Sequence, residues 1–197
     1  MTAVWAGSAH AHDAAIPQET QPGKSASGAA TEALVHVGGA FVLTDHTGRR
    51  VTDKDFLGRY MLVFFGYTFC PDVCPTELAL MAATLDLLGK DAGKIQPVFI
   101  TIDPGRDDVA ALAEYVPLFH PGIIGLTGSE EEIDRVVEAY KVIREKVSAP
   151  DGYYLMRHSA STYLMGPDGE FIGSIDFMTP VEDAAAAIRE VMRDDAM

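Results

Sequence analysis

The sequence predicts one three-layer α/β domain with a central mixed sheet. Two continuous apolar runs, Tyr60–Gly66 and Ile95–Ile102, are typical of central strands that are buried on both faces. The first is followed by apolar residues at helical spacing from Leu78 to Leu88, which indicates an amphipathic helix. Strands that alternate with helices in this way favour a layered α/β fold. A chain of 197 residues is long enough for one such domain with a core, plus a tail.

The first part of the chain does not share this pattern. Residues 1–38 are rich in Ala, Gly, Ser, Gln and Pro and show no period, so we expect a disordered tail or linker before a domain over 39–197. Within it, Trp5–Ala11 ends in the Ala-x-Ala pattern of a signal-peptidase site, but no basic segment precedes it. Either this is a signal-sequence remnant behind a start site placed too late, with the true N-terminus missing, or it is an ordinary Ala-rich tail. The first alternative places the mature protein outside the cytoplasm.

Further elements are expected on either side of the two buried strands. Asp45–Gly48 has turn chemistry and lies between two short strands, which predicts an N-terminal hairpin extension. The other expected elements before residue 127 are a helical turn at Asp53–Leu57, a helix from Val109 that breaks near Pro117 or Pro121, and a strand at Ile123–Leu126.

The C-terminal third carries the clearest boundary signals. A capping box at 129–132 opens a helix with apolar residues on one face. Strands at 162–165 and 170–175 flank a Gly-Pro-Asp-Gly turn. The segment 179–182 is interpreted as a second capping box with proline at the first helical position, which would open the last helix.

Charge and hydropathy exclude some classes of function. The formal net charge is −14 and the sequence pI about 4.6, which argues against nucleic-acid binding because phosphate requires a basic surface. The longest apolar run, Met61–Phe69, is about half of the roughly 20 residues that a membrane span needs. We therefore expect no transmembrane segment in this chain. We also expect the protein to be a monomer.

The two cysteines of the chain, Cys70 and Cys74, lie between a predicted buried strand and an amphipathic helix. Folds of this class place ligands at such turns. Pro75 suits the first helical position, which would make Cys74 the N-cap, and the positive helix N-terminus favours thiolate. Two thiolates on one turn can close a disulfide or hold a soft metal. The competing interpretation is a pair of buried structural cysteines.

The choice of metal follows from the available donors. A structural zinc site needs about four ligands, and two cysteines with one histidine fall short of that number. Two thiolates and an imidazole suit Cu(I), or Cu(II) with a further ligand. Six histidines are present, and residue chemistry alone leaves the choice among them open. His10 and His12 lie in the tail, His36 in the linker, His46 in a turn, His120 after a helix, and His158 between a loop and the strand at 162–165.

Four segments in order resemble the Sco/SenC family of copper-binding, thioredoxin-like oxidase assembly proteins. They are Gly66–Leu78 with its Cys-Pro-Asp-Val-Cys-Pro core, Thr101–Asp107, His158–Ser159 and Tyr163–Gly169, and the resemblance covers about 39–195. A C-x-x-x-C pattern alone carries little information. Combined with the proline after it, the downstream Asp-Pro and the distant histidine, it is specific.

The resemblance implies a thioredoxin-like fold and copper, as Cu(I), Cu(II) or both, held by Cys70, Cys74 and His158. It implies a metallochaperone for the copper site of cytochrome c oxidase, with subunit II as partner, on the periplasmic or extracytoplasmic face of the inner membrane. Asp103 matches an acidic family position and is assigned a supporting role beside the ligands, although an ordinary strand-end turn explains it equally well. Many members have Asp before the histidine, where this chain has Arg157, and many have an N-terminal membrane anchor. Arg157 would favour neutral imidazole and alter the charge that a partner meets.

A second function remains open, so the sequence does not decide whether the protein is an enzyme. Cys70 and Cys74 alone suffice for a thiol–disulfide oxidoreductase that reduces the oxidase subunit or another extracytoplasmic protein. Such enzymes usually carry a cis-proline before the strand that faces the cysteines. Pro150 is too far away for that role and His158 lies closer, which favours copper. A peroxidase would require Thr three residues before its cysteine, whereas Thr68 precedes Cys70 by two.

Overall fold

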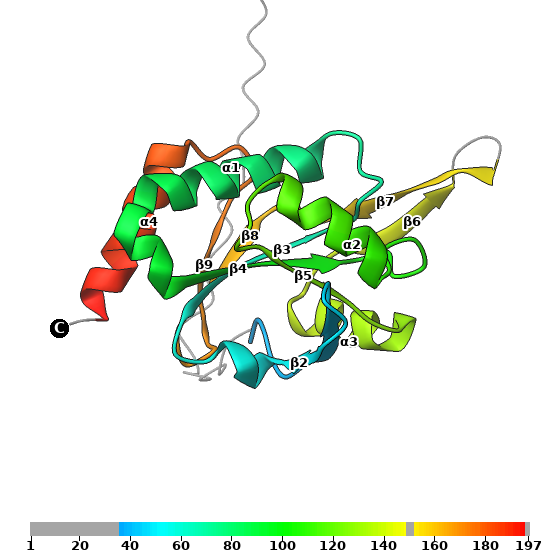
Figure 1. Ribbon diagram of the computed structural model, residues 1–197, viewed down its shortest axis with the longest axis horizontal. Coiled ribbons are helices and arrows are strands. Elements are labelled where there is room, and N and C mark those ends of the chain that lie inside the picture. Colours follow the sequence, from blue (N-terminus) through cyan, green and yellow to red (C-terminus); the bar gives the residue numbers. More distant parts are fainter. Residues whose placement is uncertain (1–35, 149–151, 196–197) are drawn as a thin grey trace, which may run out of the picture. The chain divides into compact units, whose positions relative to one another are not determined.

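The structure is a computed structural model that describes residues 36–148 and 152–195. A seven-stranded sheet with strand order β2-β1-β5-β4-β3-β8-β9 forms the middle layer. Figure 1 shows α1 and α2 on one side of this sheet and α3 on the other. The predicted three-layer α/β architecture is therefore confirmed.

The two apolar runs of the sequence form the centre of the sheet. All seven residues of β3 (Tyr60–Gly66) and all seven of β4 (Ile95–Thr101) are buried. They pair in parallel, with β5 (Ile124–Thr127) parallel to β4 on one side and β8 (Thr162–Met165) antiparallel to β3 on the other. The sheet is therefore mixed, and the carboxyl ends of β3 and β4 lie together at one edge.

The outer strands complete the sheet as expected. The N-terminal hairpin consists of β1 (Val42–Asp45) and β2 (Arg50–Thr52), and β1 also pairs with β5. At the opposite side β9 (Phe171–Ile175) pairs antiparallel with β8. Short 3-10 helices connect elements of the described chain at η1 (Asp53–Phe56), η2 (Gly89–Lys94) and η3 (Val116–Leu118).

In the described part of the chain, four α-helices cover the sheet. The longest are α1 (Val73–Leu88) and α4 (Val181–Asp194), which pack against each other. The other two are α2 (Val109–Tyr115) and α3 (Glu130–Ala139). The capping box of α3 is present: the Ser129 side chain accepts from the backbone N–H of Glu132, whose carboxylate accepts from the N–H of Ser129.

Two predicted helix starts are wrong. Helix α1 begins at Val73 with Asp72 as N-cap, so Cys74 is the second residue of the helix rather than its cap. Pro75 is tolerated at the third position because the first four N–H groups of a helix have no intrahelical partner. The capping box at 179–182 is absent, because Pro180 is the N-cap of α4 and the Thr179 hydroxyl donates to the Asp176 carbonyl at 2.7 Å.

The hairpin of β6 (Arg144–Ser148) and β7 (Tyr154–His158) was not predicted. These strands form a separate two-stranded antiparallel sheet, which projects to the right in Figure 1. The sequence of β6 is mostly polar and its residues are partly or fully exposed, so it gives no apolar signal.

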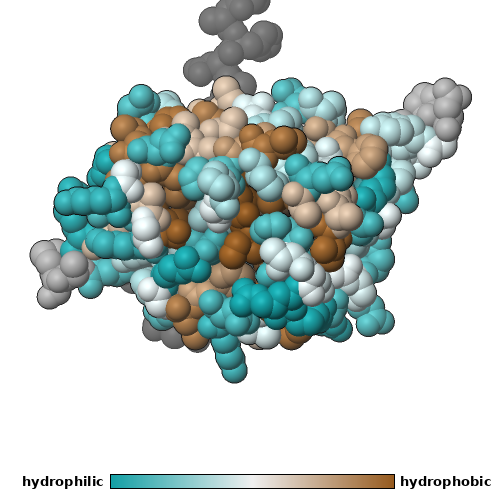
Figure 2. Space-filling model, viewed as in Figure 1, coloured by the Kyte–Doolittle hydropathy of each residue, from teal (hydrophilic) through white to brown (hydrophobic). Residues whose placement is uncertain are grey.

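The predicted tail lies almost entirely outside the described residues. From Val37 onward the chain contacts the domain: Val37 packs on the core, and the N–H of Gly38 donates to the Ala139 carbonyl at 3.0 Å. Within the described ranges, no helix is both long and apolar enough to span a bilayer. On the face drawn in Figure 2, hydrophobic residues are interspersed with hydrophilic ones.

Candidate metal centre

The fold brings Cys70, Cys74 and His158 together. Cys70 lies in the turn after β3, Cys74 in the first turn of α1, and His158 at the end of β7. The Nε2 atom of His158 lies 3.4 Å from Cys74 Sγ, although the two residues are 84 positions apart. One potential ligand atom from each of the three residues falls within 4.8 Å of the others. Two ligands of one ion are separated by at most about 4.6 Å when each bond is roughly 2.3 Å, so a small adjustment closes the set around a metal.

The turn of Cys70 fits the start of helix α1. The Asp72 side chain makes no capping hydrogen bond, and the backbone N–H of Cys74 donates to Cys70 Sγ at 3.3 Å instead. Cys70 therefore supplies the acceptor that an N-cap side chain normally provides. The partial positive charge of the helix N-terminus, which favours thiolate, therefore lies next to this half-buried sulfur.

The two thiols differ in acidity and exposure. A hydrogen bond from the Cys74 thiol, together with backbone N–H donors at Asp72 and Cys74, lowers the pKa of Cys70 well below its usual value. The same hydrogen bond and burial raise the pKa of Cys74, whose side chain is completely buried. These opposite shifts favour Cys70 as the thiolate of the free dithiol and Cys74 as the protonated partner.

The His158 ring is oriented by its neighbours. Its Nδ1 lies 2.6 Å from the Ser159 carbonyl oxygen, an acceptor that fits the Nδ1–H tautomer. The Nε2 atom that faces Cys74 then carries the free lone pair, the arrangement found at most metal-bound histidines. The rings of Phe64 and Tyr67 meet the imidazole edge to face at centroid distances of 6.0 Å.

Asp103 lies outside this group of three candidate ligands. It is buried, forms an ion pair with Arg106, and accepts a hydrogen bond from the Tyr154 hydroxyl at 2.9 Å. Since Tyr154 is the first residue of β7, the carboxylate contacts the strand that carries His158. The supporting role assigned to Asp103 stays a prediction, and these contacts are its structural basis.

Arg157 is paired on the outside of the hairpin. Its guanidinium forms an ion pair with Glu145 on β6, and both side chains are largely exposed. Successive residues of a strand point to opposite faces, so Arg157 and His158 point apart. Many family members have Asp where this chain has Arg157, and Glu145 offsets the positive charge of Arg157 at the surface.

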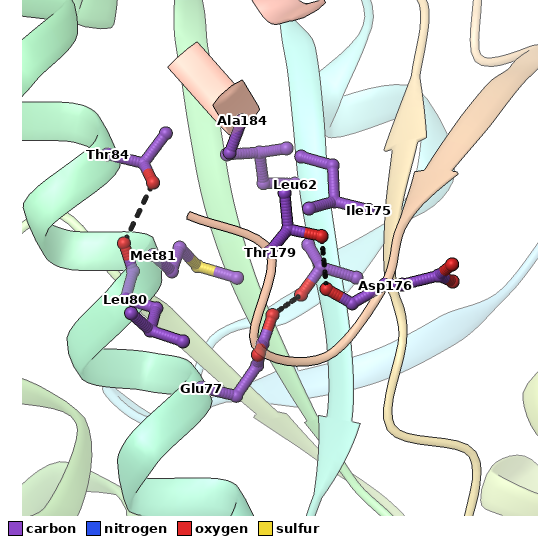
Figure 3. A pocket seen from close by; sticks show the side chains of 10 residues that line it. Leu62, Glu77, Leu80, Met81, Thr84, Ile175, Asp176, Thr179 and Ala184 are labelled. Carbon is purple, nitrogen blue, oxygen red and sulfur yellow. Dashed lines mark hydrogen bonds between the residues drawn. The ribbon is translucent and has the colours of Figure 1, made fainter. Parts of the chain in front are cut away.

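Two further buried carboxylates, Asp107 and Glu77, connect the site to the fold, and sequence reasoning missed both. Asp107 is fully buried and accepts hydrogen bonds from the Thr68 backbone at 2.9 Å and the Thr101 hydroxyl at 2.7 Å, which ties the cysteine turn to β4. Glu77, one turn after Cys74, accepts a hydrogen bond from the Thr162 hydroxyl at 2.8 Å, which ties α1 to β8 (Figure 3). Polar residues with high burial are found only once the fold is known.

The other three histidines in the described part of the chain are not grouped with the cysteines. His46 accepts a hydrogen bond from the Gly125 N–H at 3.1 Å, His120 accepts one from the Gly122 N–H at 3.0 Å, and His36 lies 3.8 Å from Glu170. Each of these three histidines thus has a partner other than the cysteines. His10, His12 and Pro150 lie outside the described residues.

An apolar groove opens beside the site. It has a volume of about 390 Å³ and runs between the cysteine turn and the β6–β7 hairpin. Val147 and Leu155 of the hairpin are exposed along it, and Cys70 and His158 are part of its lining. Any partner that exchanges a ligand or an electron pair with Cys70 has access along this groove.

Comparison with known proteins identifies the family. The sequence profile of SCO1/SenC matches residues 29–193. The chain belongs to the SCO1/SenC family. It is 44% identical over 158 residues to the mitochondrial SCO2 homolog of Danio rerio, which covers 79% of this chain and 57% of that protein. The chain matches between 53% and 62% of the length of this relative and of the SCO1 proteins of Schizosaccharomyces pombe and Homo sapiens.

Solved structures agree with this assignment. ScoI of Bradyrhizobium japonicum with copper bound is 44% identical, with a TM-score of 0.74, and covers 78% of this chain and 98% of its own. Arabidopsis thaliana ScoI with copper bound is 40% identical, with a TM-score of 0.77, and covers 80% and 99%. The family and the thioredoxin-like fold that the resemblance implied are both confirmed.

Proposed function

We propose that this protein binds one copper ion through Cys70, Cys74 and His158 and delivers it to the copper site of cytochrome c oxidase. The observation that carries the proposal is the convergence of these three side chains, with ligand atoms within 4.8 Å of one another. Family membership supports it, since relatives of 40% to 44% identity have been solved with copper bound.

The donor set suits copper. Thiolate sulfur is soft and prefers Cu(I), and imidazole binds copper in either oxidation state. Three donors fit near-trigonal Cu(I), whereas Cu(II) would require an additional ligand. Binding would take the proton from Cys74, because a thiol must be deprotonated to coordinate a metal. Copper uptake should therefore release protons and weaken as pH falls.

The partner and compartment form part of the same proposal. A copper-accepting protein such as cytochrome c oxidase subunit II would meet the site on the periplasmic or extracytoplasmic side of the inner membrane. The mitochondrial SCO2 homolog of Danio rerio and SenC of Rhodobacter capsulatus are among the relatives.

A second function, thiol–disulfide exchange, is supported by the difference between the two thiols. Thiolate Cys70 would attack a disulfide of the partner, and one partner sulfur would leave as a thiolate. Cys74, after losing its proton, would attack Cys70 in the mixed disulfide and release the second partner sulfur. The partner disulfide would gain two electrons and become a dithiol, and the Cys70–Cys74 pair would lose two and become a disulfide.

Anaerobic titration of the reduced protein with Cu(I), against a chelator of known affinity, tests the copper function. We expect one copper per chain, a large loss of affinity in His158→Ala, and loss of binding in Cys70→Ser and Cys74→Ser. His120→Ala is the matched control, because this histidine accepts a hydrogen bond within its own turn and is not grouped with the cysteines. If His158→Ala binds copper as tightly as the wild type, the ligand assignment fails and a dithiol protein remains.

A further inference from the structure

We propose that Arg106 is a positioning residue that holds β7, and with it His158, against the cysteine turn. This inference rests on the proposed copper function, because it names the group that fixes the geometry of the third ligand. Arg106 is not a ligand itself; it acts on the ligands through the residues that it contacts.

Arg106 connects three segments with one side chain. Its guanidinium forms an ion pair with Asp103 after β4, and Nη1 donates to the Tyr154 carbonyl at 3.1 Å. The guanidinium carbon lies 3.7 Å from the centroid of the Tyr154 ring and 4.9 Å from that of Phe69. The side chain is only 16% exposed, so these contacts are partly shielded from water.

Each contacted residue leads directly to a ligand. Phe69 precedes Cys70 in the turn, and Tyr154 begins the five-residue strand that ends in His158. Tyr67 stands 5.5 Å from the guanidinium and also packs edge to face on the His158 ring. Loss of Arg106 would therefore displace β7 and the His158 ring relative to the cysteine turn.

The strand β7 needs such a support. Within the described residues β7 pairs only with β6, and a lone two-stranded hairpin is at best marginally stable in water. Side chains therefore fasten the hairpin to the domain. Arg106 and Asp103 hold the start of β7, and Arg144 on β6 donates from Nε to the Ile102 carbonyl at 2.6 Å.

Arginine is suited to this position and lysine is not. A planar guanidinium can stack on aromatic faces while its N–H groups bind a carboxylate and a carbonyl in the same plane. An ammonium group has no flat face and cannot maintain all of these contacts. The Nη2 atom of Arg106 is buried and finds no hydrogen-bond partner among the described residues, which is unfavourable for folding. The position thus retains a buried cation at a cost, as expected for a group that orients a site.

A double-mutant cycle on Cu(I) affinity tests the inference, with Arg106→Met, His158→Ala and the double variant titrated against a chelator. We expect Arg106→Met alone to weaken binding by about 10- to 100-fold, the usual effect of losing a residue that orients a ligand. In the His158→Ala background the same change should have less than about a 2-fold effect, on the reasoning that it acts through His158. Arg106→Lys should recover little of the loss. Arg50→Met is the matched control, because it removes an arginine ion pair of another part of the fold, between Arg50 on β2 and Glu132 on α3.

Two further readouts separate positioning from general damage. The Cu(II) form of Arg106→Met should show weakened nitrogen hyperfine coupling in its EPR spectrum, while far-UV circular dichroism stays that of the wild type. If Arg106→Met does not fold, Arg106→Lys takes its place in the cycle, since it keeps the charge and most of the stem.

The outcomes are distinct. The role of Arg106 is overturned if Arg106→Met lowers Cu(I) affinity equally in the wild-type and His158→Ala backgrounds. It is also overturned if Arg106→Met binds Cu(I) as the wild type does while His158→Ala binds it more weakly. Both results leave the copper function intact. A His158→Ala variant with wild-type affinity overturns the proposed ligand set and this inference with it.

Discussion

The substitution Gly66→Ala tests how closely the end of β3 is packed against the metal centre. An added Cβ at Gly66 would lie 2.8 Å from Cys74 Sγ, 2.9 Å from Phe99 Cε2 and 3.1 Å from Phe64 Cε1. All three neighbours are fully buried, so none can swing into solvent. Glycine is required here because of the close approach of these atoms.

The magnitude follows from these distances. To reach ordinary contact at 3.4 Å, Cys74 Sγ and the new methyl group have to separate by about 0.6 Å. Overpacking of a core typically costs about 1–3 kcal/mol, and the stiffer unfolded chain returns about 0.4–1 kcal/mol. We therefore expect the free energy of unfolding to fall by about 1–2 kcal/mol. Because a working site tolerates shifts of only about 0.5 Å, Cu(I) affinity should fall by about 10-fold.

Urea unfolding and chelator competition measure the two effects. Gly173→Ala on β9 is the matched control, since a Cβ there meets nothing within 4 Å, and it should keep both stability and affinity. If Gly66→Ala is as stable as Gly173→Ala and binds Cu(I) as the wild type does, the packing argument at Cys74 is refuted.

Two predictions concern pH. Burial raises the pKa of Glu77 in the folded protein above its value in the unfolded chain. The protonated carboxyl therefore favours the folded state at low pH, and this contribution to the free energy of unfolding is lost as pH rises through the folded-state pKa. Glu77→Gln should then be more stable than the wild type at pH 8 and equal to it near pH 4 in urea unfolding; a wild-type advantage at pH 8 contradicts this. The lowered pKa of Cys70 predicts that iodoacetamide at pH 5 modifies Cys70 well before buried Cys74, as peptide mass mapping would show. Equal modification of the two sulfurs would exclude the assigned thiolate.

Much of the fold was predictable because burial on both faces leaves a continuous apolar signal. The strands β3 and β4 carry that signal, and their pairing places the cysteine turn at the edge of the sheet. The start of α1 was misplaced because proline is tolerated at several positions of the first helical turn. Here a sulfur atom, Cys70 Sγ, caps the helix where a cap side chain was expected.

The candidate site was only partly predictable for a different reason. The cysteine pair is visible in the sequence, but His158 lies on a hairpin without apolar periodicity and was chosen by resemblance alone. Arg106 lies in the same motif as Asp103, and the sequence analysis assigned a supporting role to Asp103 and none to Arg106. Its stacking on Tyr154 and Phe69 joins segments far apart in the chain, so nothing local indicates it.

X-ray absorption at the copper K edge of the Cu(I)-loaded protein tests the central claim most directly. The predicted first shell has two sulfur neighbours and one nitrogen neighbour per copper, with the nitrogen lost in His158→Ala. A shell of sulfur alone in the wild type, or a spectrum unchanged by that substitution, would contradict the assignment of Cys70, Cys74 and His158 as the ligands.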